Sequence, residues 1–291
     1  MKEEEKIFAG KFFCPGHPDL KAIKLRCHNL CSAYNATLED ETEKRNAIVH
    51  QIFGDFGEGS FVQGPIQIHY GTHTHIGKSF FGNFNLTIQD DAPVTIGDRC
   101  NFGPNVTIVT PMHPIIAEER RVLKTKDGRE IRVCYAKPVT IGNDCWFGAN
   151  VVVCPGVTIG DNVVIDANSL INKDVPDNCV VVGNPQRVVC DIDSYLEKRR
   201  AAQVSEAADL YDCWRRNSPE GKRGGVPPKC IFSEFFWLFE PRDTGVLSDP
   251  SFEATMALRG TRGMSYERFM QHKPEFESYE DFIEHLEGML R

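Results

Sequence analysis

Apolar residues recur at every sixth position through the middle of the chain. From residue 141 onward, the positions that lie six apart are all apolar: Ile141, Phe147, Val153, Ile159, Ile165 and Ile171. The residue after each of them is usually small or turn-forming, and the same step runs through Ile96, Phe102 and Ile108. A fixed short period of this kind predicts a β-helix, in which each short strand contacts the next coil and the buried residues stack in a column.

Six residues make one side of a triangular coil. At about 3.3 Å per residue, a side is about 20 Å long, and part of it turns the corner, where glycine and asparagine tolerate positive φ. A sandwich of alternating strands is the competing architecture, but a period of two does not require a small residue at a fixed place in each hexad. The repeat therefore favours an all-β core built as a parallel β-helix.

The repeat stops after Ile108 and resumes at Ile141, so residues 109–138 form an excursion loop. This loop contains the segment Thr110-Pro-Met-His113-Pro and a hairpin signal at Asp127-Gly128. Long loops without their own repeat are usually functional, which makes this segment the first place to look for chemistry.

Three domains follow from the limits of the repeat. Residues 61–192 form the β-helix, and residues 1–60 form a helical cap that covers its open end. We expect one cap helix from about Asp19 to Tyr34, and a second that begins after Thr37, whose side chain can cap it, and ends near Gly54. Residues 193–291 form a mostly helical C-terminal extension. Its aromatic run at residues 231–239 is expected to pack in a core instead of meeting a partner, and its last helix runs from Tyr279 to Leu290.

Composition narrows the possible partners. The 291 residues carry a net charge of −8, which disfavours nucleic acid and anionic lipid as partners. No run approaches the roughly 18 apolar residues of a membrane span, so we expect a cytoplasmic protein. The eleven cysteines are odd in number and scattered, which favours reduced thiols. Cys27 and Cys31 lack the second pair that a tetrahedral zinc site requires, and no metal is expected.

Several segments together resemble a known family. They are Ala9-Gly10-Lys11, Asn83-Phe-Asn-Leu-Thr-Ile-Gln-Asp-Asp91, Thr110-Pro-Met-His113-Pro with Glu118-Glu-Arg120, Lys137-Pro-Val-Thr-Ile-Gly, Trp146-Phe-Gly, Pro155-Gly-Val-Thr-Ile-Gly-Asp, Lys173-Asp-Val-Pro and Gly183-Asn-Pro-Gln-Arg187. Over about residues 5–192 the chain resembles the maltose and galactoside O-acetyltransferases of the hexapeptide-repeat superfamily. The resemblance implies a left-handed β-helix and a homotrimer with active sites between neighbouring subunits. It also implies acetyl transfer from acetyl-CoA to a hydroxyl of a sugar or sugar-like acceptor.

His113 is the expected catalytic residue. A hydroxyl nucleophile loses its proton as it attacks the thioester, and histidine titrates near neutral pH, so His113 suits a general base. The resemblance places the oxyanion donor at a backbone N–H just after Trp146, near Gly148 and Ala149.

The remaining site residues also follow from the resemblance. Asn83 and Asp91 match positions that bind acceptor hydroxyls, although a corner asparagine and a solvated aspartate would look the same in the sequence. Glu118 either orients His113 or pairs with a loop arginine. Trp146 and the small residues line the cofactor groove, and Asn172, Lys173 and Arg187 match the CoA contacts. The two cations are alternatively exposed surface charges.

Three departures from the family pattern leave the acceptor and the extension open. Around Cys14 the family usually has an aspartate that contacts the acceptor, and Cys190 stands where many members have a second arginine. Asn172 replaces the usual threonine. The extension of about 100 residues could be a trimer clamp, a lid or a partner-binding module.

Two other functions compete with this interpretation. The superfamily also contains metal-dependent carbonic anhydrases, and His69, His73 and His75 lie close together, but Gly71 suggests a corner that splits them. A non-catalytic scaffold with a partner-binding extension is the second alternative. Within acyl transfer, the alternative acceptor is a cell-envelope or capsular saccharide precursor.

Overall fold

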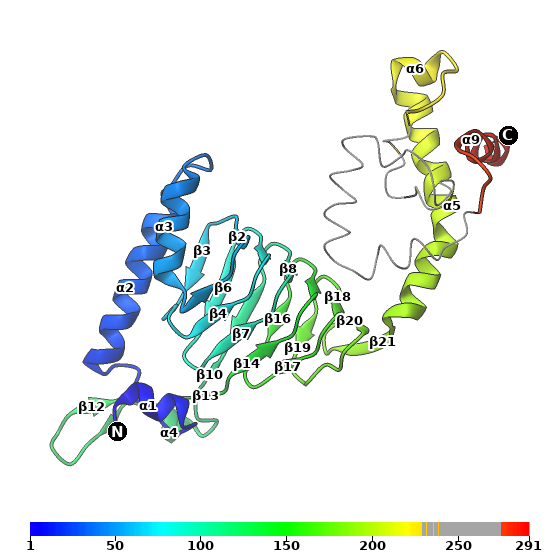
Figure 1. Ribbon diagram of the computed structural model, residues 1–291. Helices are drawn as coiled ribbons and strands as arrows, with labels where there is room; N and C mark the ends of the chain where they lie inside the picture. Colours follow the sequence, from blue (N-terminus) through cyan, green and yellow to red (C-terminus); the bar gives the residue numbers. More distant parts are fainter. Residues whose placement is uncertain (229–230, 232–234, 236–237, 239–274, 291) are drawn as a thin grey trace. The chain divides into compact units, whose positions relative to one another are not determined.

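The computed structural model describes residues 1–228, 231, 235, 238 and 275–290 (Figure 1). The chain divides into two compact units, Met1–Tyr195 and Leu196–Arg291. No helix in the described part of the chain is long and apolar enough to cross a membrane. The ten cysteines in that part are all free thiols.

Three parallel sheets, here called S1, S2 and S3, wind into the coils of the first unit (Figure 1). S1 contains β1 (Asp55–Phe56), β4 (Thr74–Ile76), β7 (Val94–Ile96), β14 (Val139–Ile141) and β17 (Thr158–Ile159). S2 contains β2 (Phe61–Val62), β5 (Phe81–Gly82), β8 (Asn101–Phe102), β15 (Trp146–Phe147), β18 (Val164–Ile165), β20 (Cys179–Val182) and β21 (Arg187–Asp191), the last pairing antiparallel. S3 contains β3 (Ile66–Ile68), β6 (Leu86–Gln89), β9 (Thr107–Val109), β16 (Val152–Val153) and β19 (Leu170–Ile171).

The sixth-position residues form the interior columns that the repeat predicted. In S1, Ile96 pairs with Ile141, and Ile141 pairs with Ile159. In S2, Phe102 pairs with Phe147 with their rings 4.3 Å apart, and both side chains are buried. Because strands of successive coils are in register, each apolar side chain covers the one in the coil before it. The predicted parallel β-helix is confirmed.

Asparagine turns the corner between S2 and S3. Asn85, Asn105, Asn150 and Asn168 all have φ between 60° and 62°. Their side-chain amides donate in series to the next coil, with N···O distances of 2.8, 2.8 and 3.2 Å. Asparagine suits this place because it tolerates the left-handed conformation and supplies both a donor and an acceptor.

The excursion loop leaves after β9 and returns at β14. It contains β10 (Pro111–Met112), α4 (Ala117–Arg120), β11 (Leu123–Lys124), β12 (Glu130–Ile131) and β13 (Tyr135–Ala136). β11 and β12 pair as a hairpin around Gly128, whose φ is 82°, in agreement with the Asp-Gly signal. β10 pairs antiparallel with β13, which brings the two ends of the loop together.

The N-terminal helices differ in detail from the expectation. They are α1 (Glu3–Phe8), α2 (Pro18–Asn35) and α3 (Thr42–Ile52). α1 was not predicted, because six residues are too few to show a helical period. α3 begins at Thr42, so the prediction of a start after Thr37 was wrong. The Thr37 hydroxyl donates to the Tyr34 carbonyl at 2.6 Å and therefore belongs to the end of α2.

The second unit has its own small core. It contains α5 (Ile192–Asn217), α6 (Pro219–Lys222) and α9 (Tyr279–Met289), and α9 confirms the predicted last helix. Buried side chains of α5 and α9, including Tyr211, Phe282 and Leu286, pack together with Leu238. Leu238 is a member of the predicted aromatic run, and Ile231 and Phe235 of that run pack against the cluster, as expected. Residues 232–234, 236–237 and 239 lie outside the described residues.

Candidate functional site

Several titratable side chains lie at the corner where S3 connects to S1. In successive coils it contains residues 69–73, residues 90–93 and the start of the excursion loop. His113 follows β10 and is exposed, and its Nδ1 lies 3.3 Å from the sulfur of Cys134. Cys134 packs with Tyr70 in one buried cluster. The structure thus brings the loop histidine to the corner that also carries Asp91.

Asp90 holds this corner together. Its carboxylate accepts the N–H groups of Tyr70 and Gly71, at 2.7 and 2.8 Å, and the hydroxyl of Thr74 at 2.8 Å. His73 Nδ1 lies within 3.0 Å of the carbonyl oxygens of both Asp90 and Asp91. Both carboxylate oxygens of Asp90 are therefore occupied by groups of this turn, so its role is structural.

Asp91 lies in the same turn, but one of its carboxylate oxygens has no hydrogen-bond partner among the described residues. Its side chain is buried, and the oxygen without a partner is Oδ2. Burial and the neighbouring Asp90 raise the pKa of Asp91 to about 6. His69 Nε2 lies 3.9 Å from that oxygen, and burial lowers the pKa of His69 to about 4. An unpaired buried acceptor beside an imidazole suits a ligand hydroxyl, which can donate to one and accept from the other.

Asn83, Gly148 and Ala149 lie at a different corner, between S2 and S3, and Trp146 lies in β15 just before that corner. The Asn83 side-chain oxygen accepts the N–H of Phe84 at 2.8 Å, and Trp146 is 53% exposed. One side of the coil separates this corner from that of His113, a distance of about 20 Å for six extended residues. Within one chain these residues and His113 are therefore not brought together.

The two candidate oxyanion donors differ in availability. The Gly148 N–H donates to the Ile165 carbonyl at 2.7 Å, within the coil-to-coil ladder. No such bond occupies the Ala149 N–H in the part of the chain that the structure describes. Gly148 has a packing role, because a Cβ there would lie 2.5 Å from the nitrogen of Ala167. Of the two, only Ala149 retains a donor for a ligand.

Lys173 and Arg187, the cations predicted to bind the cofactor, lie next to Gln186, which the sequence analysis did not select. Gln186 Oε1 accepts the N–H groups of Asn172 and Lys173 at 2.8 and 3.2 Å, and its Nε2 donates to the Lys173 carbonyl at 2.9 Å. Arg187 follows at once, and both cationic side chains are exposed. Gln186 belongs to the segment that carried the resemblance, but only its contacts reveal that it holds the Lys173 backbone next to Arg187.

Glu118 does not contact His113. Its Oε1 lies 3.8 Å from Nη2 of Arg121, and both side chains are 71% exposed. Arg120 instead supports the loop, because its Nη1 donates to the carbonyls of Pro114 and Ile115, both at 3.2 Å. Of the two alternatives for Glu118, the structure places it with a loop arginine.

The three clustered histidines have separate partners. His73 Nε2 lies 3.1 Å from Glu4 Oε1, and His75 Nδ1 lies 2.5 Å from Asp55 Oδ2. Among the described residues, no group of three or more His, Cys, Asp or Glu side chains could hold a metal ion. Cys27, which the sequence analysis weighed as half of a zinc site, donates its thiol hydrogen to the Ile68 carbonyl.

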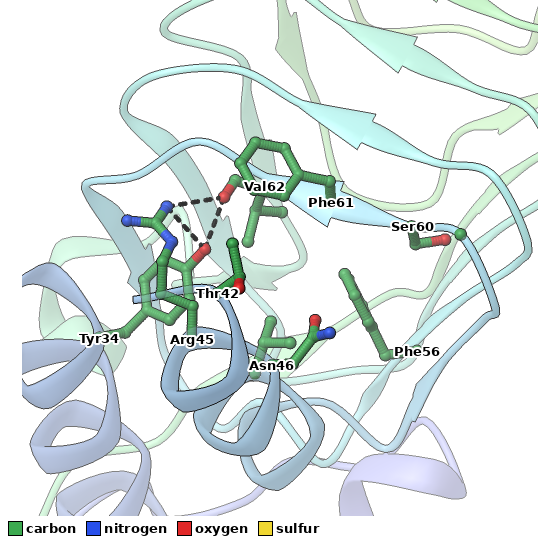
Figure 2. A pocket seen from close by; sticks show the side chains of 10 residues that line it. Tyr34, Thr42, Arg45, Asn46, Phe56, Ser60, Phe61 and Val62 are labelled. Carbon is green, nitrogen blue, oxygen red and sulfur yellow. Dashed lines mark hydrogen bonds between the residues drawn. The ribbon is translucent and has the colours of Figure 1, made fainter. Parts of the chain in front are cut away.

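A cavity of about 230 Å³ beneath α3 is separate from all these residues (Figure 2). Arg45 dominates its wall, and its Nη2 donates to the Tyr34 hydroxyl and to the carbonyls of Val62 and Gln63, at 3.0, 3.2 and 2.6 Å. Figure 2 shows the guanidinium between α2 and β2. These bonds fasten the helical cap to the first coil.

Comparison with known proteins places the chain in a family. The hexapeptide repeat of succinyl-transferase matches residues 93–116 and 138–173, and the maltose acetyltransferase hexapeptide capping motif matches residues 6–57. The galactoside O-acetyltransferase of Escherichia coli K12 is 43% identical over 195 residues, which cover 66% of this chain and 90% of that protein. The galactoside O-acetyltransferase of Lactococcus lactis is 40% identical over 64% of this chain and 86% of its own.

Solved structures agree with the sequence matches. A maltose O-acetyltransferase from Clostridium difficile 630 superposes with a TM-score of 0.61 at 41% identity, over 66% of this chain and 98% of its own. A galactoside acetyltransferase in complex with coenzyme A gives a TM-score of 0.60 at 43% identity, over 66% of this chain and 92% of its own. The matching solved structures are left-handed β-helices. The parallel solenoid of this chain is therefore a left-handed β-helix of about six turns, as the resemblance implied. The chain therefore belongs to the hexapeptide-repeat family of galactoside and maltose O-acetyltransferases and is an acetyl-CoA-dependent acetyltransferase.

Proposed function

We propose that the protein transfers the acetyl group of acetyl-CoA to a hydroxyl of a sugar-like acceptor, with His113 as the general base. The observation that carries this proposal is the corner between S3 and S1. There the exposed His113, part of the excursion loop, lies beside Cys134, and the same corner carries Asp91, whose buried Oδ2 has no hydrogen-bond partner among the described residues. The related proteins named as galactoside and maltose O-acetyltransferases support a saccharide as the acceptor.

The chemistry assigns one role to each group. His113 takes the proton of the acceptor hydroxyl as its oxygen attacks the thioester carbonyl, and the thiol of CoA leaves. General-base catalysis of this kind is worth roughly 10²- to 10⁴-fold. The Ala149 N–H donates to the oxygen that becomes negative in the tetrahedral intermediate, and one such donor is worth roughly 10²- to 10³-fold.

The acceptor is held by the polar groups around this reaction centre. Asp91 Oδ2 accepts a hydroxyl of the acceptor, which would give a partner to the buried oxygen. Asn83 contributes its side-chain amide, since its Nδ2 is a donor while its Oδ1 is already bonded to Phe84.

The cofactor is bound at the same corners. Lys173 and Arg187 supply positive charge to the phosphates of CoA, which an acidic protein must provide locally. Trp146 covers the pantetheine arm with its exposed indole. The Gln186 side chain fixes the backbone at Asn172 and Lys173, because its oxygen accepts both of their N–H groups.

We propose a homotrimer with sites between subunits, and the separation of the two corners supports a shared site. His113 and Asp91 occupy one corner, whereas Asn83 and Ala149 occupy another about 20 Å away, with Trp146 beside it. A neighbouring copy that presents its second corner to the first corner of this chain completes the site, and closed rotational symmetry repeats that site at each interface.

The first test measures thiol release from acetyl-CoA with a panel of mono- and disaccharide acceptors, in the intact protein and in His113→Ala. We expect acceptor-dependent release that falls at least 100-fold in the variant, while acetyl-CoA binding persists. Undiminished release in His113→Ala would remove that residue from the mechanism. No release with any acceptor of the panel would contradict the proposal of a mono- or disaccharide acceptor.

The second test examines the shared site by co-expression of two inactive variants. His113→Ala and Trp146→Ala are mixed, and each shared site then needs an intact His113 from one subunit and an intact Trp146 from its neighbour. Random assembly at equal amounts restores about one quarter of the sites. Mixed trimers that stay inactive would show that both residues must come from one chain.

A further inference from the structure

The thiol of Cys134 lies next to Nδ1 of His113, the proposed general base. Cys134 immediately precedes β13, and His113 immediately follows β10. Met112 pairs with Tyr135 across these two strands, so residues 113 and 134 adjoin the same pair of strands. The Cys134 sulfur lies 3.3 Å from His113 Nδ1, which is within the range of a hydrogen bond to sulfur.

The backbone holds this thiol in place. The N–H and C=O of Cys134 exchange hydrogen bonds of 3.0 and 2.9 Å with Phe13, and the Phe13 side chain is buried. Cys134 is 4% exposed, whereas His113 is exposed. A fixed, buried sulfur next to a side chain that reaches the solvent can set the orientation of that side chain.

The partner of one ring nitrogen decides what the other can do. A neutral imidazole has one N–H and one lone pair, and a base needs its lone pair on the nitrogen that faces the substrate. When the base accepts a proton, both nitrogens become N–H donors. For His113, the sulfur of Cys134 lies within hydrogen-bond distance of Nδ1, so it can influence which ring nitrogen carries the proton.

A role as nucleophile does not suit Cys134. Burial raises the pKa of its thiol, Asp91 and Cys14 raise it further, and only Arg132 acts in the opposite direction. The thiol is therefore protonated near neutral pH, and the nucleophilic form, the thiolate, is scarce.

We propose that Cys134 is a positioning residue, whose sulfur accepts the Nδ1–H of His113 and thereby directs the Nε2 lone pair of His113 toward the acceptor hydroxyl. This inference rests on the proposed function of His113 as the base. It adds the requirement that the active tautomer carries its proton on Nδ1.

The test compares Cys134→Ala with Cys134→Ser, because serine keeps a small acceptor at this place and alanine does not. Cys179→Ala is the matched control: its thiol is also buried, but it donates to the Pro176 carbonyl, away from His113. The first readout is the ¹⁵N spectrum of histidine-labelled protein, in which His113→Asn identifies the His113 signals. We expect the Nδ1-protonated signals in the wild-type protein and in Cys134→Ser, and a mixture of tautomers in Cys134→Ala.

The second readout is kinetic. Loss of one hydrogen bond of ordinary strength lowers kcat about 3- to 10-fold, so Cys134→Ala should show that loss with KM for acetyl-CoA within about twofold of the wild-type value. Cys134→Ser should recover most of kcat, and Cys179→Ala should be unchanged. Melting curves of all variants identify any that fail to fold. If Cys134→Ala does not fold, the tautomer measurement is made on Cys134→Ser alone.

The outcomes separate the two proposals. If His113→Ala is inactive while Cys134→Ala has the wild-type tautomer and kcat, Cys134 does not position the base. If Cys134→Ala loses activity and Cys134→Ser does not recover it, a packing role replaces the positioning role. If His113→Ala remains active, the proposed function of His113 fails first.

Discussion

His69 Nε2 and Asp91 Oδ2 face each other at 3.9 Å, and burial keeps both side chains from ionising as readily as they do in water. The pKa of the carboxyl is raised to about 6 and that of the imidazole is lowered to about 4. Between these two values both groups are neutral in the folded protein. Their effects on stability therefore have opposite signs over the same pH range.

Asp91→Asn should gain stability relative to the wild type as the pH rises from 4 to 7. Between about pH 4 and 6 the folded wild type holds a proton on Asp91 that the unfolded chain has released, so this group lowers wild-type stability as pH rises. Asparagine does not titrate, so the free energy of unfolding of Asp91→Asn minus that of the wild type should rise by about 2 to 3 kcal/mol from pH 4 to 7. Melting temperatures at pH 4.5 and 7.5 measure this, with the exposed Asp40→Asn as control. A constant difference between Asp91→Asn and wild type would contradict it.

His69→Gln should show the opposite trend. Between about pH 4 and 6.5 the unfolded chain protonates this imidazole while the folded protein keeps it neutral, so His69 makes the wild type more stable as pH rises. The variant should therefore lose stability relative to wild type over that interval. The same melting series, with the exposed His50→Gln alongside, tests the sign. A gain in relative stability with rising pH would refute the assignment of a buried neutral imidazole.

Arg45→Met should loosen the helical cap. The variant removes the donor of the Gln63 carbonyl, whereas the Val62 carbonyl keeps the Tyr34 hydroxyl, so we expect a cost of about 1 to 3 kcal/mol. Thermal unfolding followed by circular dichroism should show a melting temperature several degrees lower. Lys44→Met, next along the chain, removes only an exposed ion pair with Glu41 and should cost less than about 1 kcal/mol. Equal effects of the two substitutions would argue against the clamp.

The asparagine corner predicts a ranked series at Asn150. Alanine loses both amide bonds of the ladder and must adopt a φ of 61°, which costs about 1 to 2 kcal/mol for a residue with a Cβ. Glycine also loses the bonds but adopts this φ without strain. The free energy of unfolding should therefore decrease from asparagine to glycine to alanine. Urea titrations give this order, and alanine equal to glycine would show that backbone conformation does not matter there.

The β-helix was predictable because its signal repeats. Each hexad contributes the same apolar position, so agreement among Ile141, Ile159 and the others outweighs any single residue. The start of α3 was not predictable in this way, because Thr37 and Glu41 can both precede a helix and only the bond from Thr37 to Tyr34 settles the choice. The short α1 had no periodic signal.

The candidate site was predictable in its residue types but not in its arrangement. The loop motif pointed to His113, and the structure adds Cys134 as its neighbour, 21 positions along the chain. The sequence alone left Glu118 with two possible partners, and the structure pairs it with Arg121. Neither Gln186 nor the spare oxygen of Asp91 has a signature that could be found without the contacts.

The sequence by itself determined the solenoid and the place where the loop leaves it, because the coils stack by a local repeat in which every strand sees the same neighbours. Only the tertiary structure decided which side chains share a corner. That depends on how many residues each coil and the excursion loop contain, and hence on which distant positions come into register. Asp91 and Asn83, eight residues apart, lie at different corners, whereas His69 and Asp91, in successive coils, face each other.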